Sequence, residues 1–186
     1  MKKSIIVVED FYEDTNKILD IASTFTYKTD INFYKGYRSE ETYKPTSLFN
    51  TIQDLIQQDI DKDSWNKHPN ACFQLTTAED PIVYHMDSQR WAGVLYLSPF
   101  PRLESGTKTY INKIDGCTHS SSMTKDTFKR GNYDSTQFDV VDSIGNIFNR
   151  LVLFDGKKIH SAGPYWGNNI INGRLVQLFF FNTTDT

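Results

Sequence analysis

From residue 71 onward, short runs of apolar residues alternate with clusters of turn residues. Such regularly spaced short runs are typical of the strands of an antiparallel sandwich or barrel. We therefore predict strands over residues 71–76, 82–87, 92–97, 107–111, 147–154, 159–162 and 174–182. These strands are numerous enough for a jelly roll, so the pattern predicts a mainly β domain.

The N-terminal part of the chain follows a different pattern. A β-branched run at residues 5–8 predicts a short strand, and apolar residues recur at helical spacing over residues 10–22 and 48–60. We expect residues 1–70 to form a helical support that flanks a β core at residues 71–182.

Residues 112–146 form the longest stretch without strong periodicity, and they are rich in Ser, Thr, Asp, Gly and Lys. A loop of this length in a compact domain is usually functional or mobile. We expect this segment to be a lid-like insertion in the β core.

Aromatic and basic residues interleave between residues 27 and 44. The aromatic residues are Tyr27, Phe33, Tyr34, Tyr37 and Tyr43, and the basic ones are Lys28, Lys35, Arg38 and Lys44. Rings beside cations can hold a single-stranded nucleic acid or a peptide. The acidic residues in the same stretch, Asp30, Glu40 and Glu41, favour a simpler interpretation, an exposed loop whose rings partly cover the core.

Length and composition fit one domain spanning residues 1–186, because 38% of the residues are hydrophobic and 14% are aromatic. The net charge is −3, so a global positive field of the kind that binds nucleic acid is absent and such a partner is not expected. No apolar stretch is long enough to span a membrane. Two cysteines, Cys72 and Cys117, are too few for a disulfide framework, which predicts free thiols and a cytoplasmic protein.

His85 and Asp87 stand two positions apart in a segment that reads as extended. Alternate side chains of a strand point to the same face, so these two can converge on one spot. A neutral imidazole and a carboxylate are good ligands for a divalent metal, and a second histidine would complete a two-histidine, one-carboxylate facial triad.

His160 is the candidate for that second histidine, because it follows the apolar run that ends at Phe154 and a turn at Asp155 and Gly156. Arg174 then opens the last apolar run. An arginine at the head of such a strand is costly to bury unless it meets an anion. The other histidines, His68 and His119, lack a carboxylate at fixed spacing, and we interpret both as loop residues.

The ordered set of His85, Asp87, His160 and Arg174 resembles the 2-oxoglutarate/Fe(II)-dependent dioxygenases, and most closely their prolyl-4-hydroxylase-like branch. The resemblance covers residues from about 71 to 182. It implies a double-stranded β-helix, the jelly roll of cupin-like proteins, with flanking helices.

The resemblance also implies roles for individual residues. Fe(II) would be held by His85, Asp87 and His160, and Arg174 would grip the far carboxylate of the cosubstrate 2-oxoglutarate. Tyr96 resembles the tyrosine that hydrogen-bonds the same carboxylate. The sequence departs from the family at Val176, where a serine is common.

The activity implied is hydroxylation with O2, releasing succinate and CO2. Peptidyl proline is the substrate that the nearest branch favours, and a free amino acid or another small metabolite is the alternative. The sequence leaves two further interpretations open, a metal-free cupin-like binding module and a cupin dioxygenase that needs no cosubstrate. Arg174 argues against the second, because that chemistry gives no reason for a buried cation.

Overall fold

The computed structural model describes residues 3–30, 34–169 and 171–184. Phe33, in the aromatic and basic stretch, and the first and last two residues of the chain lie outside these ranges. The strands are β1 (Ile5–Val8), β2 (Tyr27–Lys28), β3 (Tyr37–Thr42), β4 (Cys72–Thr76), β5 (Trp91–Tyr96), β6 (Thr107–Asn112), β7 (Phe138–Ile144), β8 (Leu151–Asp155), β9 (His160–Ala162) and β10 (Arg174–Phe181). The helices are α1 (Thr15–Thr24), α2 (Thr46–Ile56) and α3 (Lys62–Asn66), with short 3-10 turns at Leu103–Ser105, Ser120–Ser122 and Ser135–Gln137.

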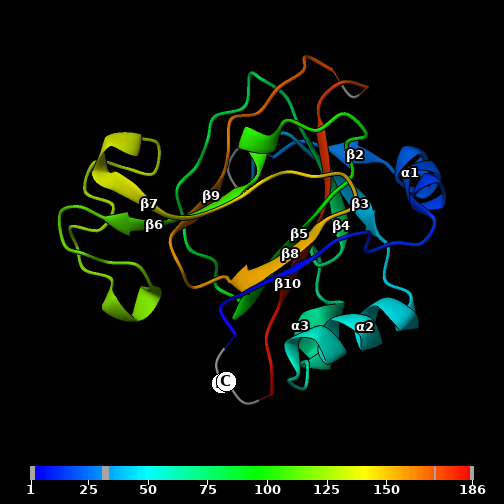
Figure 1. The fold of residues 1–186 in the computed structure, drawn as a ribbon, viewed down its shortest axis with the longest axis horizontal. Coiled ribbons are helices and arrows are strands. Elements are labelled where there is room, and N and C mark those ends of the chain that lie inside the picture. The colour runs from blue at the N-terminus through cyan, green and yellow to red at the C-terminus, as the bar shows by residue number, and fades with distance from the viewer. Residues whose placement is uncertain (1–2, 31–33, 170, 185–186) are drawn as a thin grey trace.

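The strands form two antiparallel sheets. A seven-stranded sheet has the order β1-β8-β5-β10-β4-β3-β2, and a three-stranded sheet has the order β7-β6-β9. Figure 1 shows β6 and β7 projecting at one end of the molecule, α1 beside β2 and β3, and α2 with α3 below the large sheet. The prediction of a mainly β protein with flanking helices is confirmed.

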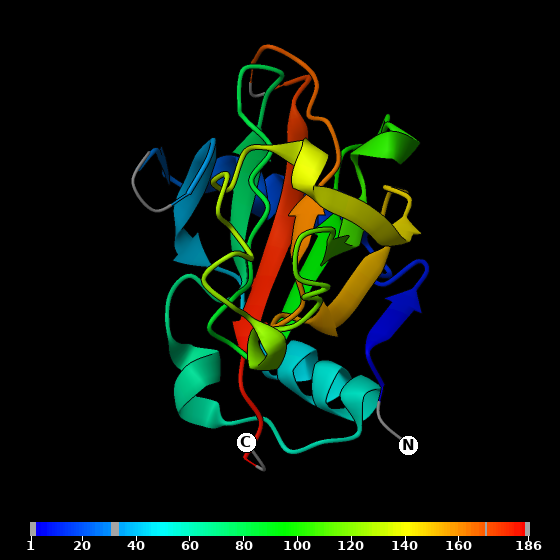
Figure 2. The same ribbon diagram turned by 90° about the vertical axis from the view of Figure 1, so that its left-hand side faces the viewer.

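Strand β10 lies in the middle of the large sheet, paired with β5 on one side and β4 on the other (Figure 2). Its residues are apolar on both faces, because Phe179 and Phe181 pack towards the helices while Val176 and Leu178 pack on the opposite face. A strand covered on both faces reads as a continuous apolar run. Full burial of one such side chain stabilises the fold by about 1.5–3 kcal/mol.

The helices cover the outer face of the large sheet. Asp14 caps α1 by accepting a hydrogen bond from the Lys17 N–H at 3.0 Å, which is why this helix begins at Thr15 rather than near residue 10. Helix α2 ends where Gln57 adopts a left-handed conformation, with φ of 56°. The apolar stripe of α2 contributes buried Leu48, Ile52 and Ile56 to the outer core.

A second cluster of buried hydrophobic residues lies on the inner face of the large sheet. A third hydrophobic cluster lies at the small sheet. The second cluster includes Ala92, Tyr96, Phe154 and Val176, and the third consists of Tyr84, Tyr110, Cys117, Phe138 and Ile159. The space between the inner face and the small sheet is therefore the place where side chains of both sheets can meet.

Six of the predicted strands form within a residue or two of their expected bounds, and two predictions are wrong in part. Residues 82–87 are extended but carry only one isolated bridge, from His85 to His160. The strand expected at residues 147–154 begins only at Leu151, because a turn with Asn149 at φ of 61° precedes it.

The sequence pattern missed four elements. Helix α3 lies in a short, mostly polar segment for which no element was predicted, and β7 lies inside the aperiodic stretch of residues 112–146. The aromatic and basic stretch contains β2 and β3, so it is not only a loop, and β3 pairs with β4.

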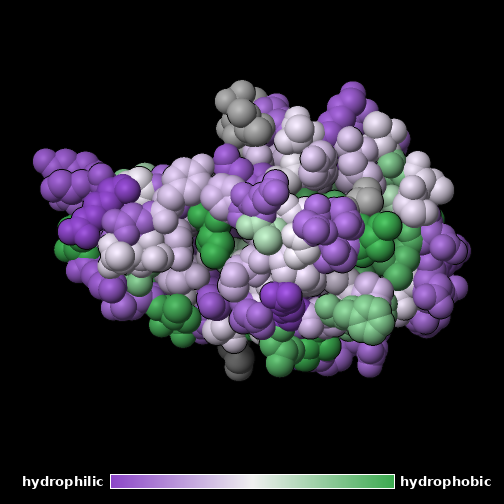
Figure 3. Space-filling view, turned by 90° about the horizontal axis from the view of Figure 1, so that it is seen from above, coloured by the Kyte–Doolittle hydropathy of each residue, from purple (hydrophilic) through white to green (hydrophobic). Residues whose placement is uncertain are grey.

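Cys72 and Cys117 are both buried and free, as the sequence predicted. None of the helices in the described part of the chain is long and apolar enough to cross a membrane. Seen from above, the projecting end that carries the 113–137 segment shows mostly hydrophilic residues, which suits a segment surrounded by solvent (Figure 3).

Candidate active site

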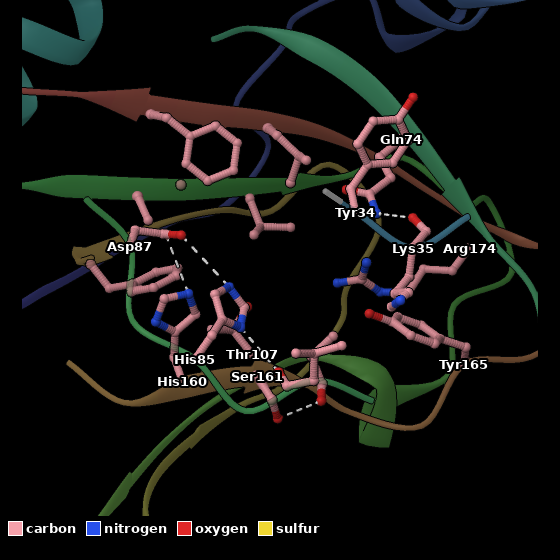
Figure 4. A pocket seen from close by; sticks show the side chains of 18 of the residues that line it. Tyr34, Lys35, Gln74, His85, Asp87, Thr107, His160, Ser161, Tyr165 and Arg174 are labelled. Atoms are coloured by element: carbon pink, nitrogen blue, oxygen red, sulfur yellow. Dashed lines mark hydrogen bonds and ion pairs between the residues drawn. The ribbon is translucent and has the colours of Figure 1, made fainter. Parts of the chain in front are cut away.

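A cavity of about 340 Å³ lies between the inner face of the large sheet and strands β6 and β9. Figure 4 shows His85, Asp87 and His160 together in one part of it, with Arg174, Tyr165 and Lys35 grouped away from them. Thr107 and Ser161 also line the cavity. A cavity of this size is in the range of small-molecule sites.

The segment before β5 aims His85 and Asp87 into this cavity by strict alternation. Ile82, Tyr84 and Met86 pack into the third core cluster, whereas Val83, His85 and Asp87 line the cavity. Tyr84 is held firmly, since its ring stacks on Phe138 at 4.8 Å between centroids. The predicted shared face of the two residues is therefore confirmed, although the segment is not a regular strand.

His160 enters the cavity from β9, directly opposite His85. The two residues exchange backbone hydrogen bonds, with His85 N donating to His160 O at 3.0 Å and His160 N donating to His85 O at 2.9 Å. Their rings lie 4.3 Å apart between centroids. The ring of Phe154 on β8 packs edge-on against His160 at 4.8 Å.

The three side chains converge closely enough to share one metal ion. Nε2 of His85 lies 3.6 Å from Oδ1 of Asp87, and Nε2 of His160 lies 3.3 Å from Oδ2. One ligand atom from each residue lies within 4.8 Å of the others. Ligand atoms held about 2.1 Å from a metal are about 3 Å apart at adjacent positions, so little adjustment is required.

Backbone contacts fix which nitrogen of each histidine faces Asp87. Nδ1 of His85 lies 3.0 Å from Val83 O, and Nδ1 of His160 lies 2.8 Å from Lys158 O. A carbonyl only accepts, so each Nδ1 carries the hydrogen and Nε2 is the nitrogen that can bind a metal. Asp87 Oδ2 is fully buried and faces Nε2 of His160, which would need a second proton to donate to it, so a cation fits the group.

The charges in this group act on one another. Burial and the neighbouring His160 lower the pKa of His85, which keeps its ring neutral. Burial alone would raise the pKa of Asp87 and lower that of His160, but their mutual attraction outweighs it, lowering the first and raising the second. Without a metal, His160 therefore favours a proton facing Asp87, which a bound cation would replace.

Arg174 begins β10 and is only 4% exposed. Nε donates to Ser105 O at 3.0 Å, and the guanidinium lies 5.4 Å from the Tyr96 ring and 5.7 Å from the Tyr165 ring. No carboxylate in the described part of the chain lies within ion-pair distance of it. A buried cation of this kind, on the cavity wall, suits an anionic ligand.

Tyr96 does not line the cavity. It is completely buried, and its hydroxyl lies 2.7 Å from Thr107 Oγ1, which does line the cavity. The structure therefore places Tyr96 behind Thr107 and beneath Arg174, so that it reaches the cavity through these two residues.

Among the cavity residues that the sequence did not predict as site residues are three tyrosines and two basic residues: Tyr34, Tyr133, Tyr165, Lys35 and Arg38. Three of them lie in the stretch of interleaved aromatic and basic residues at 27–44, so this pattern was the sequence signal for a binding site. In the structure these three residues line the cavity. Tyr133 belongs to the predicted lid-like insertion.

Two histidines stay outside the cavity, as predicted. His68 Nε2 lies 3.3 Å from Ser39 O, and His119 lies 3.6 Å from Asp155. The described residues contain one group of metal-ligand type, and neither histidine belongs to it.

Gly156 supports Asp87, and we expect Gly156→Ala to weaken metal binding about ten- to hundred-fold, as disturbing an outer-shell partner of a ligand typically does. Its carbonyl accepts the Asp87 N–H at 2.7 Å. A Cβ there would lie 2.9 Å from Gln89 O and 3.3 Å from Asp87 Cβ, so Asp87 must shift.

Calorimetric Mn(II) titration measures this effect. Gly145→Ala is the matched control, because its Cβ would meet nothing closer than 3.7 Å. Equal affinities in the two variants would show that Gly156 does not position Asp87.

Comparison with known proteins finds no match for the sequence, whereas the structure matches several solved structures. No protein-family model matches the sequence, and no curated protein matches it significantly. Solved structures do match. HygX from Streptomyces hygroscopicus, with nickel, 2-oxoglutarate and hygromycin B bound, has a TM-score of 0.63 at 10% identity, over 98% of this chain and 84% of HygX.

Prolyl hydroxylases match over similar lengths. A Pseudomonas putida prolyl-4-hydroxylase has a TM-score of 0.51 at 13% identity, covering 96% of this chain and 91% of that one. A Trichoplax adhaerens prolyl hydroxylase, in complex with a hypoxia-inducible-factor peptide fragment, has a TM-score of 0.54 at 12% identity, over 96% and 83%. This chain therefore shares its fold with HygX and with these prolyl hydroxylases, as its resemblance to the prolyl-4-hydroxylase-like branch predicted.

Proposed function

We propose that this protein is a 2-oxoglutarate- and Fe(II)-dependent dioxygenase that hydroxylates its substrate, on a double-stranded β-helix. One observation carries the proposal. A single cavity joins a His-Asp-His group to a buried arginine that has no carboxylate partner among the described residues. Either feature alone would fit several kinds of protein, but the combination matches the needs of a metal and a dicarboxylate together.

His85, Asp87 and His160 would hold the Fe(II). Their contribution is to present two Nε2 atoms and a carboxylate from a preformed arrangement, with both rings oriented by backbone carbonyls. A metal-free binding module would leave the buried Asp87 Oδ2 with Nε2 of His160, 3.3 Å away, as its partner, which requires the buried His160 ring to carry a second proton. That arrangement is costly, which favours the metal-binding alternative.

Arg174 would bind the far carboxylate of 2-oxoglutarate through paired charge-assisted hydrogen bonds. The contact from Nε to Ser105 O fixes the guanidinium plane, and its terminal nitrogens remain for the ligand. Tyr96 would act indirectly, by holding the hydroxyl of Thr107 at the cavity wall and packing under Arg174.

Fe(II) together with 2-oxoglutarate would supply the oxidising chemistry that places one oxygen atom of O2 in a substrate C–H bond and the other in succinate, with loss of CO2. The chain's part is to exclude water and orient the reactants. The apolar side chains of Ala92, Val94, Phe154 and Leu178 line the cavity beside the metal ligands and suit that role.

The substrate would be a peptide or a small molecule. The resemblance favours peptidyl proline, and a free amino acid or another small metabolite is the alternative. Among the structural neighbours, one is a prolyl hydroxylase with a bound peptide and another holds hygromycin B, so the fold itself accepts both classes.

Segment 113–137 would frame substrate entry, since Tyr133 lines the cavity. The remainder of the predicted lid-like insertion forms β7, which pairs along the length of β6 and belongs to the small sheet.

The test is turnover of 2-oxoglutarate by the purified protein with Fe(II) and O2. Succinate should form slowly without a substrate and faster with the right one, and mass spectrometry of candidate substrates should show the gain of one oxygen. His160→Ala should form no succinate under the same conditions. Equal succinate formation by wild type and His160→Ala would reject the proposal.

A further inference from the structure

The cavity carries more positive charge than the proposed reaction uses. Its described lining includes two arginines, Arg38 and Arg174, and one anionic side chain, Asp87. A divalent metal and dianionic 2-oxoglutarate neutralise one another, so the excess remains when both are bound. The chain as a whole has a net charge of −3, so this local excess is a property of the cavity.

Arg38 is the residue that carries this excess without an assigned role. It enters the cavity from β3, where its backbone is opposite Gln74 of β4. Nε donates to Gln74 Oε1 at 3.2 Å, and Gln74 Nε2 in turn donates to Lys35 O at 2.6 Å. The side chain is therefore held in a defined direction by a partner that is itself anchored.

The rest of the guanidinium is prepared for an in-plane ligand. Its central carbon lies 4.6 Å from the centroid of the Tyr34 ring and 5.7 Å from that of the Phe180 ring. The two rings pack against the guanidinium, and Gln74 occupies its Nε. The edge that carries the terminal nitrogens therefore remains available for hydrogen bonding to a ligand. No carboxylate of the described residues lies within ion-pair distance of Arg38.

Arg38 reaches towards the metal ligands. Phe180, which it contacts, pairs with Ala92 across β10 and β5. Ala92 and Asp87 lie side by side, because a Cβ built on Gly156 would be 3.4 Å from one Cβ and 3.3 Å from the other. Arg174 begins β10 whereas Arg38 enters from β3, so the two arginines approach the cavity from different strands.

We propose that Arg38 binds an anionic group of the substrate, and that the substrate is a small molecule bearing a carboxylate or a phosphate. This inference rests on the proposed function. Arg38 would hold the anion in bidentate fashion beside the metal, while Tyr34, Tyr133 and Tyr165 supply ring surfaces around the remainder of the molecule. A free amino acid satisfies these demands better than a neutral, internal proline of a peptide.

The test measures binding to protein loaded with Mn(II) and 2-oxoglutarate, using charged probes and their neutral counterparts. One arm compares free L-amino acids with their carboxamides, and a second compares sugar monophosphates with the parent sugars. A third arm uses a proline peptide blocked at both ends. We expect at least one acid or phosphate to bind at least tenfold more tightly than its neutral counterpart, which also identifies the source of the anion.

Arg38→Gln should reduce that affinity to the level of the neutral counterpart and leave 2-oxoglutarate affinity within about twofold. Arg38→Lys, which keeps the charge but not the fork, should fall between the two. Lys17→Gln removes the same charge from exposed α1, on the far side of the large sheet, and should change neither affinity.

Three outcomes overturn the inference. In the first, no charged probe binds better than its neutral counterpart. In the second, Arg38→Gln leaves the preference for the charged probe intact. In the third, the blocked peptide binds most tightly, and its affinity is the same in wild type and Arg38→Gln. Failure of the proposed function gives a different result from failure of this inference. In that case the wild type binds no 2-oxoglutarate in the presence of Mn(II), before any probe is added.

Discussion

Asp87→Ala is expected to abolish tight metal binding. The wild type should bind one Mn(II), used as an inert substitute for Fe(II), because two Nε2 atoms and a carboxylate converge there. A ligand at a hundred times its Kd stabilises a protein by about 2.7 kcal/mol. For a domain of this size, that corresponds to a rise of about 5–10 °C in the thermal midpoint. Asp87→Ala should show no such rise.

Each variant is compared with its own metal-free midpoint, so that any effect of the substitution on folding cancels. His85→Ala should behave like Asp87→Ala. His119→Ala is the matched control, since this histidine also lies near an aspartate but outside the cavity. Metal retained at wild-type affinity by Asp87→Ala would contradict the assignment of all three ligands.

Arg174→Lys is expected to weaken 2-oxoglutarate binding about ten- to hundred-fold while metal affinity barely changes. Lysine keeps the charge but loses the fork that matches a carboxylate, and a hydrogen bond to a charged group contributes roughly 1.5–3 kcal/mol. The measurement is an anaerobic titration of 2-oxoglutarate into Mn(II)-loaded wild type and variant.

Arg38→Lys is the control for this titration, because it makes the same chemical change elsewhere in the cavity. Equal affinities for 2-oxoglutarate in wild type and Arg174→Lys would identify Arg174 as a structural cation. The protein would then lack the residue that separates a dioxygenase from a generic metal-binding β protein.

The metal group was predictable from the sequence because its geometry depends on local alternation. Val83, His85 and Asp87 share a face in any extended chain, and apolar neighbours on the other face bury the segment. The central strand β10 was equally easy to predict, since a strand covered on both sides is mostly apolar, and only Arg174 and Gln177 interrupt the apolar run.

Elements that depend on distant partners could not be read in this way. Strand β7 is an edge strand with Val140 and Val141 exposed, and its pairing with β6 is what defines it. Arg38 has polar neighbours on β3, and only the register with β4 directs it into the cavity. The resemblance gave Tyr96 a hydrogen bond to the cosubstrate carboxylate, and three-dimensional packing places Thr107 between Tyr96 and the cavity.

The reciprocal backbone bonds between His85 and His160 have a consequence for amide hydrogen exchange. Each of these amides donates to the carbonyl of the other residue, so neither can exchange until the same bridge opens. A metal bound by both side chains would hold the two residues together and so oppose the opening of these backbone hydrogen bonds. The two amides should therefore exchange at a common rate in the metal-free protein and slow down together, by a common factor, when the metal binds.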